Sequence, residues 1–103
     1  MVKRLSELKF HAGADDGCHG MFVKDTPHYK YVLGDQGPYI SWQQSRGKNV
    51  FEKTQKFNIL IESVKKKGVK HRIEVMGNMI IDGHHRAAIA LARGDKDIEC
   101  RER

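Results

Sequence analysis

The sequence lacks long apolar runs, and it contains only two cysteines in 103 residues. No stretch approaches the roughly 18 consecutive apolar residues that a membrane-spanning helix requires, and residues 1–10 lack the apolar segment of a signal peptide. Because Cys18 and Cys100 are too few for the disulfide framework of a small secreted domain, we expect both to be free thiols. Together these absences favour a soluble cytoplasmic protein with no membrane partner.

The chain also lacks internal repeats and low-complexity segments. Its length fits one domain of residues 1–103, and its 39% hydrophobic residues suffice for a single core. The net charge is +6, and 12 of the 19 basic residues lie in residues 51–103. This basic surplus favours an anionic partner, such as a nucleotide or a nucleic acid.

Residues 1–48 carry few regular signals and are rich in glycine and histidine. Short runs with β-propensity at 21–23 and 29–33 predict two short strands, while the glycines and proline of 34–38 predict a turn. A long functional loop fits this half equally well, so both interpretations stay open.

Residues 49–103 are easier to interpret, and they begin with a helix. Asn49 can cap the first turn and Glu52 can reach back to it, while Gly68 can end the helix in a left-handed conformation. Between them, apolar residues recur every three or four positions, which predicts a helix over 49–67 with one buried stripe.

Further elements follow this helix. Alternation over 69–75 predicts a half-buried strand with His71 on its apolar side, and Gly77-Asn78 predicts a hairpin to a strand at 79–81. An alanine-rich helix over 84–93 and an edge strand over 97–101 complete the pattern. The sequence therefore predicts an α/β fold, with a small mixed sheet and packed helices.

The segment from Asp82 to Arg86 carries the most chemical information. It reads Asp-Gly-His-His-Arg, and it joins the apolar strand to the alanine-rich helix. Amides at a helix N-terminus attract anions, Gly83 lets an anion approach the backbone, and Arg86 can donate two hydrogen bonds to a phosphate. This pattern predicts a phosphate site at the helix start.

The order of these elements resembles the ParB/sulfiredoxin-like superfamily. The resemblance covers about residues 57–101 and rests on the helix end at 61–68, the hairpin, and the motif at 82–86. It implies that Gly83, His84, His85 and Arg86 hold the phosphates of a nucleotide such as ATP or CTP, with Mg²⁺. The histidine-containing motif looks more like free-serine kinases and ParB-like proteins of phages or plasmids.

Two details qualify the resemblance. His84 stands where sulfiredoxins carry a reactive cysteine, so we expect no reduction of sulfinic acids by that mechanism. The second phosphate element of the superfamily corresponds here to residues 45–49, which makes Arg46 a candidate phosphate ligand. A basic, solvated loop is the alternative interpretation of this segment.

The motif also contains candidate catalytic groups, namely Asp82, His84 and His85. Asp82 can serve as a general base or Mg²⁺ ligand, or it can cap the helix. Adjacent helical residues point about 100° apart, so we expect one of the two histidines to face the site. The histidine and cysteine spacings match no zinc motif, and we therefore expect no structural metal.

These residues are compatible with three classes of function. The first is binding of a nucleotide or nucleic-acid phosphate, with nuclease or phosphoryl-transfer activity. The second is a non-enzymatic, DNA-associated or regulatory module with the same phosphate pocket. The third is a small-molecule kinase of the same fold.

Overall fold

The computed structural model describes residues 1–13 and 16–103. The strands are β1 (Val2–Arg4), β2 (Lys9–Phe10), β3 (Ile73–Met76), β4 (Met79–Asp82) and β5 (Asp97–Glu102). The helices are α1 (Pro27–Val32), α2 (Gly37–Ser45), α3 (Val50–Lys67) and α4 (His84–Ala92), and 3₁₀ turns lie at Leu5–Glu7 and Val23–Asp25.

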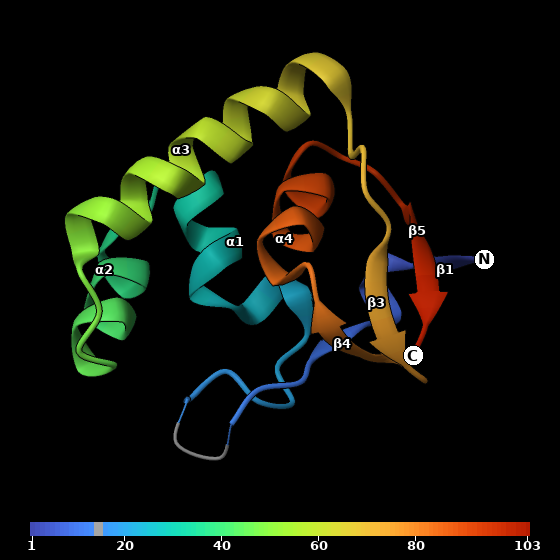
Figure 1. Cartoon of the computed structure of the whole chain (residues 1–103), viewed down its shortest axis with the longest axis horizontal. Helices are drawn as coiled ribbons and strands as arrows, with labels where there is room; N and C mark the ends of the chain where they lie inside the picture. The colour runs from blue at the N-terminus through green and yellow to red at the C-terminus, as the bar shows by residue number, and fades with distance from the viewer. Residues whose placement is uncertain (14–15) are drawn as a thin grey trace.

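The five strands form one mixed sheet in the order β1-β5-β3-β4-β2. β3 and β4 pair antiparallel as the expected hairpin, β5 is parallel to β3, and β2 is parallel to β4. In Figure 1, α4 lies between this sheet and the helices α1, α2 and α3. The prediction of an α/β fold with a small mixed sheet is confirmed.

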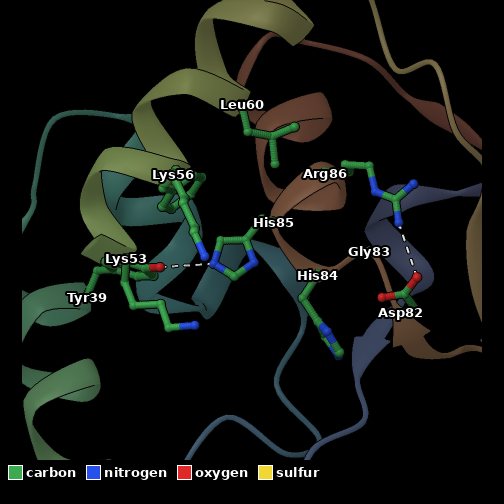
Figure 2. A pocket seen from close by; sticks show the side chains of 10 residues that line it. Tyr39, Lys53, Lys56, Leu60, Asp82, Gly83, His84, His85 and Arg86 are labelled. Atoms are coloured by element: carbon green, nitrogen blue, oxygen red, sulfur yellow. Dashed lines mark hydrogen bonds and ion pairs between the residues drawn. The ribbon is translucent and has the colours of Figure 1, made fainter. Parts of the chain in front are cut away.

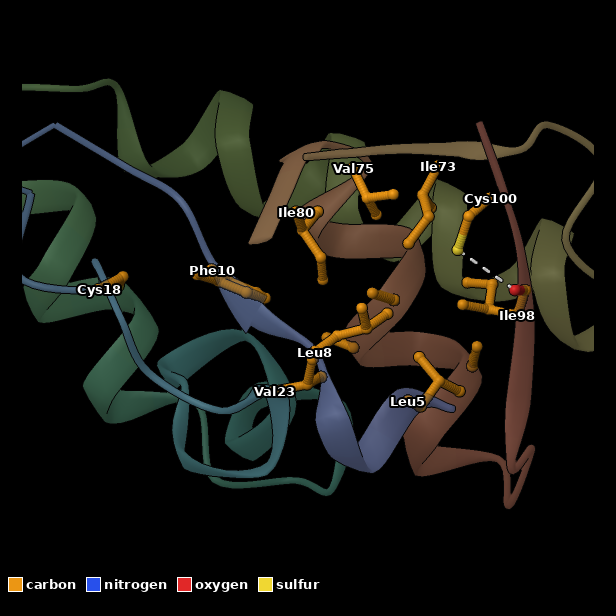
Figure 3. Close-up of a cluster of buried hydrophobic side chains, with 13 residues drawn as sticks. Leu5, Leu8, Phe10, Cys18, Val23, Ile73, Val75, Ile80, Ile98 and Cys100 are labelled. Atoms are coloured by element: carbon orange, nitrogen blue, oxygen red, sulfur yellow. Dashed lines mark hydrogen bonds between the residues drawn. The ribbon is translucent and has the colours of Figure 1, made fainter. Parts of the chain in front are cut away.

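The alanine-rich composition of α4 explains its central position. Ala87, Ala88 and Ala90 are fully buried against the apolar side chains of the sheet, which Figure 3 shows pointing into the core. Ile89 turns instead toward a second cluster, which contains Phe57 of α3 and aromatic residues of α1 and α2. Short side chains let the backbone of α4 approach both layers closely.

Two expectations for residues 1–48 are wrong. The segments 21–23 and 29–33 are not strands, and most of 27–45 is helical rather than loop. Thr26 caps α1 by accepting a hydrogen bond from the Tyr29 amide at 3.2 Å, and Pro27 occupies the first turn of that helix. Local capping and tertiary packing therefore override the β-propensity of the tyrosines and valine.

The strands after α3 also differ from expectation. β3 begins at Ile73 rather than at residue 69, so the alternation before it has no structural meaning and His71 is exposed. β5 is not an edge strand, because β1 pairs antiparallel with its outer side. This pairing joins residues almost 100 positions apart, which local sequence patterns do not reveal.

Candidate functional site

The chain changes from strand to helix at Gly83. Its φ of 95° is left-handed, and a Cβ at this position would lie 2.6 Å from Cγ2 of Ile73 on β3. Glycine is therefore required both by the backbone conformation and by the close approach of β3. In the described part of the chain, no side chain caps the amides at the start of α4.

A pocket of about 300 Å³ opens at this helix start (Figure 2). Its wall combines the motif with residues from α2 and α3. The lining residues are Tyr39, Lys53, Lys56, Phe57, Leu60, Asp82, Gly83, His84, His85 and Arg86. All five residues of the Asp-Gly-His-His-Arg motif thus line one pocket.

Lys53 and Lys56 bring positive charge to the pocket from α3, and sequence patterns did not single them out. They lie three positions apart, which places both on one side of the helix. Lys56 pairs with Glu52 at 3.0 Å, but both side chains are more than half exposed, so this pair is weak. Only the packing of α3 identifies these two lysines as pocket residues, because the side of α3 that carries Phe57 faces α4.

Arg86 lines the pocket and also ties α4 to the segment before β3. Its Nη1 donates to the carbonyl oxygens of His71 at 3.1 Å and Arg72 at 3.4 Å, and its Nη2 donates to Asp82 at 3.3 Å. Asp82 therefore pairs with Arg86 and does not cap α4. Arg86 has a structural role in addition to any contact with a ligand.

His85 is held against aromatic rings in the wall of the pocket. Its Nε2 lies 3.0 Å from the hydroxyl of Tyr39, and its ring packs against those of Phe57 and His28. Burial lowers the pKa of His85 from 6.5 to about 4, with further lowering from nearby positive groups, including Lys53. His85 is consequently neutral at pH 7.

His84 turns in a different direction but still lines the pocket. Its Nε2 donates to the carbonyl oxygen of His11 at 2.9 Å, and its ring lies edge-on to Phe10. Burial lowers the pKa of His84, partly opposed by its backbone hydrogen bonds. Both histidines therefore line the pocket, although only one of them was expected to face it.

Arg46 does not line this pocket. Its guanidinium stacks over the ring of Trp42 at 4.2 Å from the centroid, and its Nε pairs with Asp16 at 3.5 Å. It lines a neighbouring pocket of about 220 Å³, which shares His84 and His85 with the first one. Arg46 and the two lysines thus line different pockets, which among the described residues have only His84 and His85 in common.

Acidic groups able to hold a cation are few. Among the described residues that line the first pocket, Asp82 is the single carboxylate. Within residues 1–13 and 16–103, no group of three or more His, Cys, Asp or Glu side chains is arranged to hold a metal ion. A Mg²⁺ ion at Asp82 would therefore take most of its oxygen ligands from phosphates and water.

Comparisons with protein-family models, with curated proteins and with solved structures give no match for this chain. The resemblance to the ParB/sulfiredoxin-like superfamily therefore stays a prediction from the sequence motifs. Among the described residues, no helix is long and apolar enough to cross a membrane.

Proposed function

We propose that the pocket at the start of α4 binds a phosphate group. One observation carries this proposal: the uncapped amides of α4 face a pocket that also contains Lys53, Lys56 and Arg86. Helix N-terminal amides and cationic side chains both stabilise an anion, and phosphate accepts hydrogen bonds from both.

The pocket suits the phosphate end of a larger ligand. Its volume of about 300 Å³ is at the lower limit of the roughly 300–1,000 Å³ range of small-molecule sites. Phe57 and Leu60 add an apolar wall beside the charged groups. A nucleotide such as ATP or CTP, or a phosphate of a nucleic-acid backbone, has this combination of charge and apolar surface, and the net charge of +6 favours such partners.

A catalytic function is the second candidate, and the position of Asp82 favours it. Its carboxylate lines the pocket, its side chain is 63% exposed, and it lies beside the guanidinium of Arg86. In nuclease or phosphoryl-transfer chemistry, including a small-molecule kinase, Asp82 would orient a nucleophile or a phosphate-bound Mg²⁺ ion. A non-enzymatic, DNA-associated module would use the same pocket for binding alone.

The lysines of α3 provide the test of phosphate binding. Titration calorimetry of ATP, CTP and a short single-stranded DNA should detect binding to the wild type by at least one of them. For that ligand, Lys53→Ala and Lys56→Ala should each lower affinity about tenfold, because each removes a charged contact with phosphate.

The matched control is Lys66→Ala, which removes the same charge from the exposed last turn of α3. It should leave the affinity within about twofold of the wild type. Equal losses in all three variants would show non-specific attraction by net charge, and no loss in any of them would place the site elsewhere.

A further inference from the structure

A chain of hydrogen bonds runs from α2 to His85. Arg46 Nη1 donates to Gln43 Oε1 at 3.2 Å, Gln43 Nε2 donates to the Tyr39 hydroxyl at 2.9 Å, and that hydroxyl lies 3.0 Å from His85 Nε2. Gln43 and Tyr39 are each only 1% exposed, so water does not compete for these bonds. The proposed phosphate pocket is thus connected to Arg46, which does not line it.

The donor and acceptor groups allow only one direction for the hydrogen bonds in this series. A guanidinium has no acceptor, so Arg46 fixes the amide of Gln43 with its oxygen toward Arg46 and its nitrogen toward Tyr39. In the opposite orientation, the amide nitrogen of Gln43 would face the guanidinium of Arg46, and both groups are donors. The Tyr39 oxygen therefore accepts from Gln43, and its own proton is left for another acceptor.

The only acceptor for the Tyr39 proton in the described part of the chain is His85 Nε2. A neutral imidazole that accepts at one nitrogen carries its proton on the other. In Figure 2 the second ring nitrogen, Nδ1, lies on the side away from Tyr39, toward Gly83 and His84. Nδ1 has no hydrogen-bond partner among the described residues.

We propose that Arg46, Gln43 and Tyr39 hold His85 as the Nδ1–H tautomer, so that His85 presents a neutral N–H donor to the bound phosphate. The part that concerns phosphate rests on the function proposed above. Gln43 and Arg46 are then positioning residues, which act through Tyr39. His85 acts as a donor and not as a base, since its Nε2 lone pair is already engaged.

The tautomer can be measured directly on the ligand-free protein. Long-range ¹H–¹⁵N correlation spectra of the histidine rings at pH 7.5 distinguish a protonated from an unprotonated Nδ1. The wild type should show His85 with Nδ1 protonated and Nε2 unprotonated. A protonated Nε2 in the wild type would overturn the proposal.

Gln43→Glu should reverse the tautomer. A carboxylate only accepts, so Glu at this position pairs with Arg46 and accepts a hydrogen bond from the Tyr39 hydroxyl. The Tyr39 oxygen then accepts a hydrogen bond from His85 Nε2–H. Gln44→Glu is the matched control, because it makes the same charge change at an exposed neighbour and should leave the tautomer unchanged. An unchanged tautomer in folded Gln43→Glu would contradict the proposal.

Tyr39→Phe supplies a second variant in case Gln43→Glu does not fold. It removes the hydroxyl and keeps the ring, so His85 should return to the tautomer mixture of a free imidazole. Retention of a pure Nδ1–H tautomer in Tyr39→Phe would show that the hydrogen bonds through Tyr39 do not control the tautomer of His85.

Phosphate affinity separates the two parts of the proposal. Gln43→Glu should bind inorganic phosphate about tenfold more weakly than Gln44→Glu. In Gln43→Glu the unprotonated Nδ1 of His85, an acceptor, faces the anion. A reversed tautomer with equal affinities would refute the contact between His85 and phosphate. An Nδ1–H tautomer in a wild type that binds no phosphate would refute the proposed function and leave the hydrogen-bond chain established.

Discussion

Gly83 alone sets the direct change from β4 to α4 within the Asp-Gly-His-His-Arg motif. Its left-handed φ lets the chain leave β4 and enter α4 at once, and the missing side chain leaves room for Ile73. The glycine was predicted from the sequence as a place where an anion approaches the backbone. The structure adds a second cause, which is the packing of the chain against β3.

Gly83→Ala should lower the free energy of unfolding by on the order of 2–4 kcal/mol, because it combines backbone strain with a steric clash. Gly94→Ala is the control, since Gly94 has nearly the same φ, 96°, and a Cβ at that position would have nothing within 4 Å. It should cost about 1–2 kcal/mol from backbone strain alone. Urea unfolding of both variants measures the difference, and equal losses would show that the contact with Ile73 has no energetic role.

The composition of the pocket was only partly predictable at this scale. The residues from Asp82 to Arg86 are adjacent in sequence, so a local motif was enough to bring them into one site. Lys53 and Tyr39 lie about 30 and 40 positions earlier, and they reach the pocket only because α3 packs against α4 and α2 packs against α3. No local pattern distinguishes Lys53 from the other lysines of α3.

At the scale of elements, α3 was predicted well because its signals are local. Asn49 accepts a hydrogen bond from the Glu52 amide at 3.1 Å, and the helix ends at Gly68, which has a φ of 75°. Caps and apolar periodicity act over a few residues and survive any tertiary arrangement. The boundaries of α3 and α4 therefore agree with expectation to within one residue.

The elements that were missed depend on distant partners. β1 is a strand because it pairs with β5, and β2 because it pairs with β4. α1 had a local signal in Thr26-Pro27, a cap residue followed by a residue suited to the first turn. The β-propensity of its tyrosines and valine predicts a strand, and it outweighs the capping signal in the sequence.

At the scale of the whole molecule, the region around α4 buries neutral histidines. His28 is 2% exposed, its Nδ1 has no hydrogen-bond partner in the described part of the chain, and burial lowers its pKa well below 6.5. The pKa of His85 is lowered to about 4, also mainly by burial. Unfolding exposes both rings to water, where they take up protons near pH 6.5.

This difference makes stability depend on pH. The unfolded chain binds more protons than the folded one between about pH 6.5 and 4, so the free energy of unfolding is greatest above pH 6.5 and falls as the pH decreases. The slope should approach about 1.4 kcal/mol per pH unit for each buried histidine. Urea unfolding at several pH values from 7.5 to 4.5 measures it.

Two variants assign the slope to the buried rings. His28→Phe keeps an aromatic ring and removes one titrating group, so the slope should become shallower. His71→Gln removes an exposed histidine and should leave the slope unchanged. A stability that is constant from pH 7 to 5 in the wild type would contradict the account.

An NMR titration tests whether the start of α4 binds phosphate. Inorganic phosphate is added to ¹⁵N-labelled protein at constant ionic strength, and the backbone amide shifts are followed. We predict that the amides of His84, His85 and Arg86 shift most and that their shifts saturate together. Small, unsaturated shifts centred on the exposed lysines at 65–67 would contradict it.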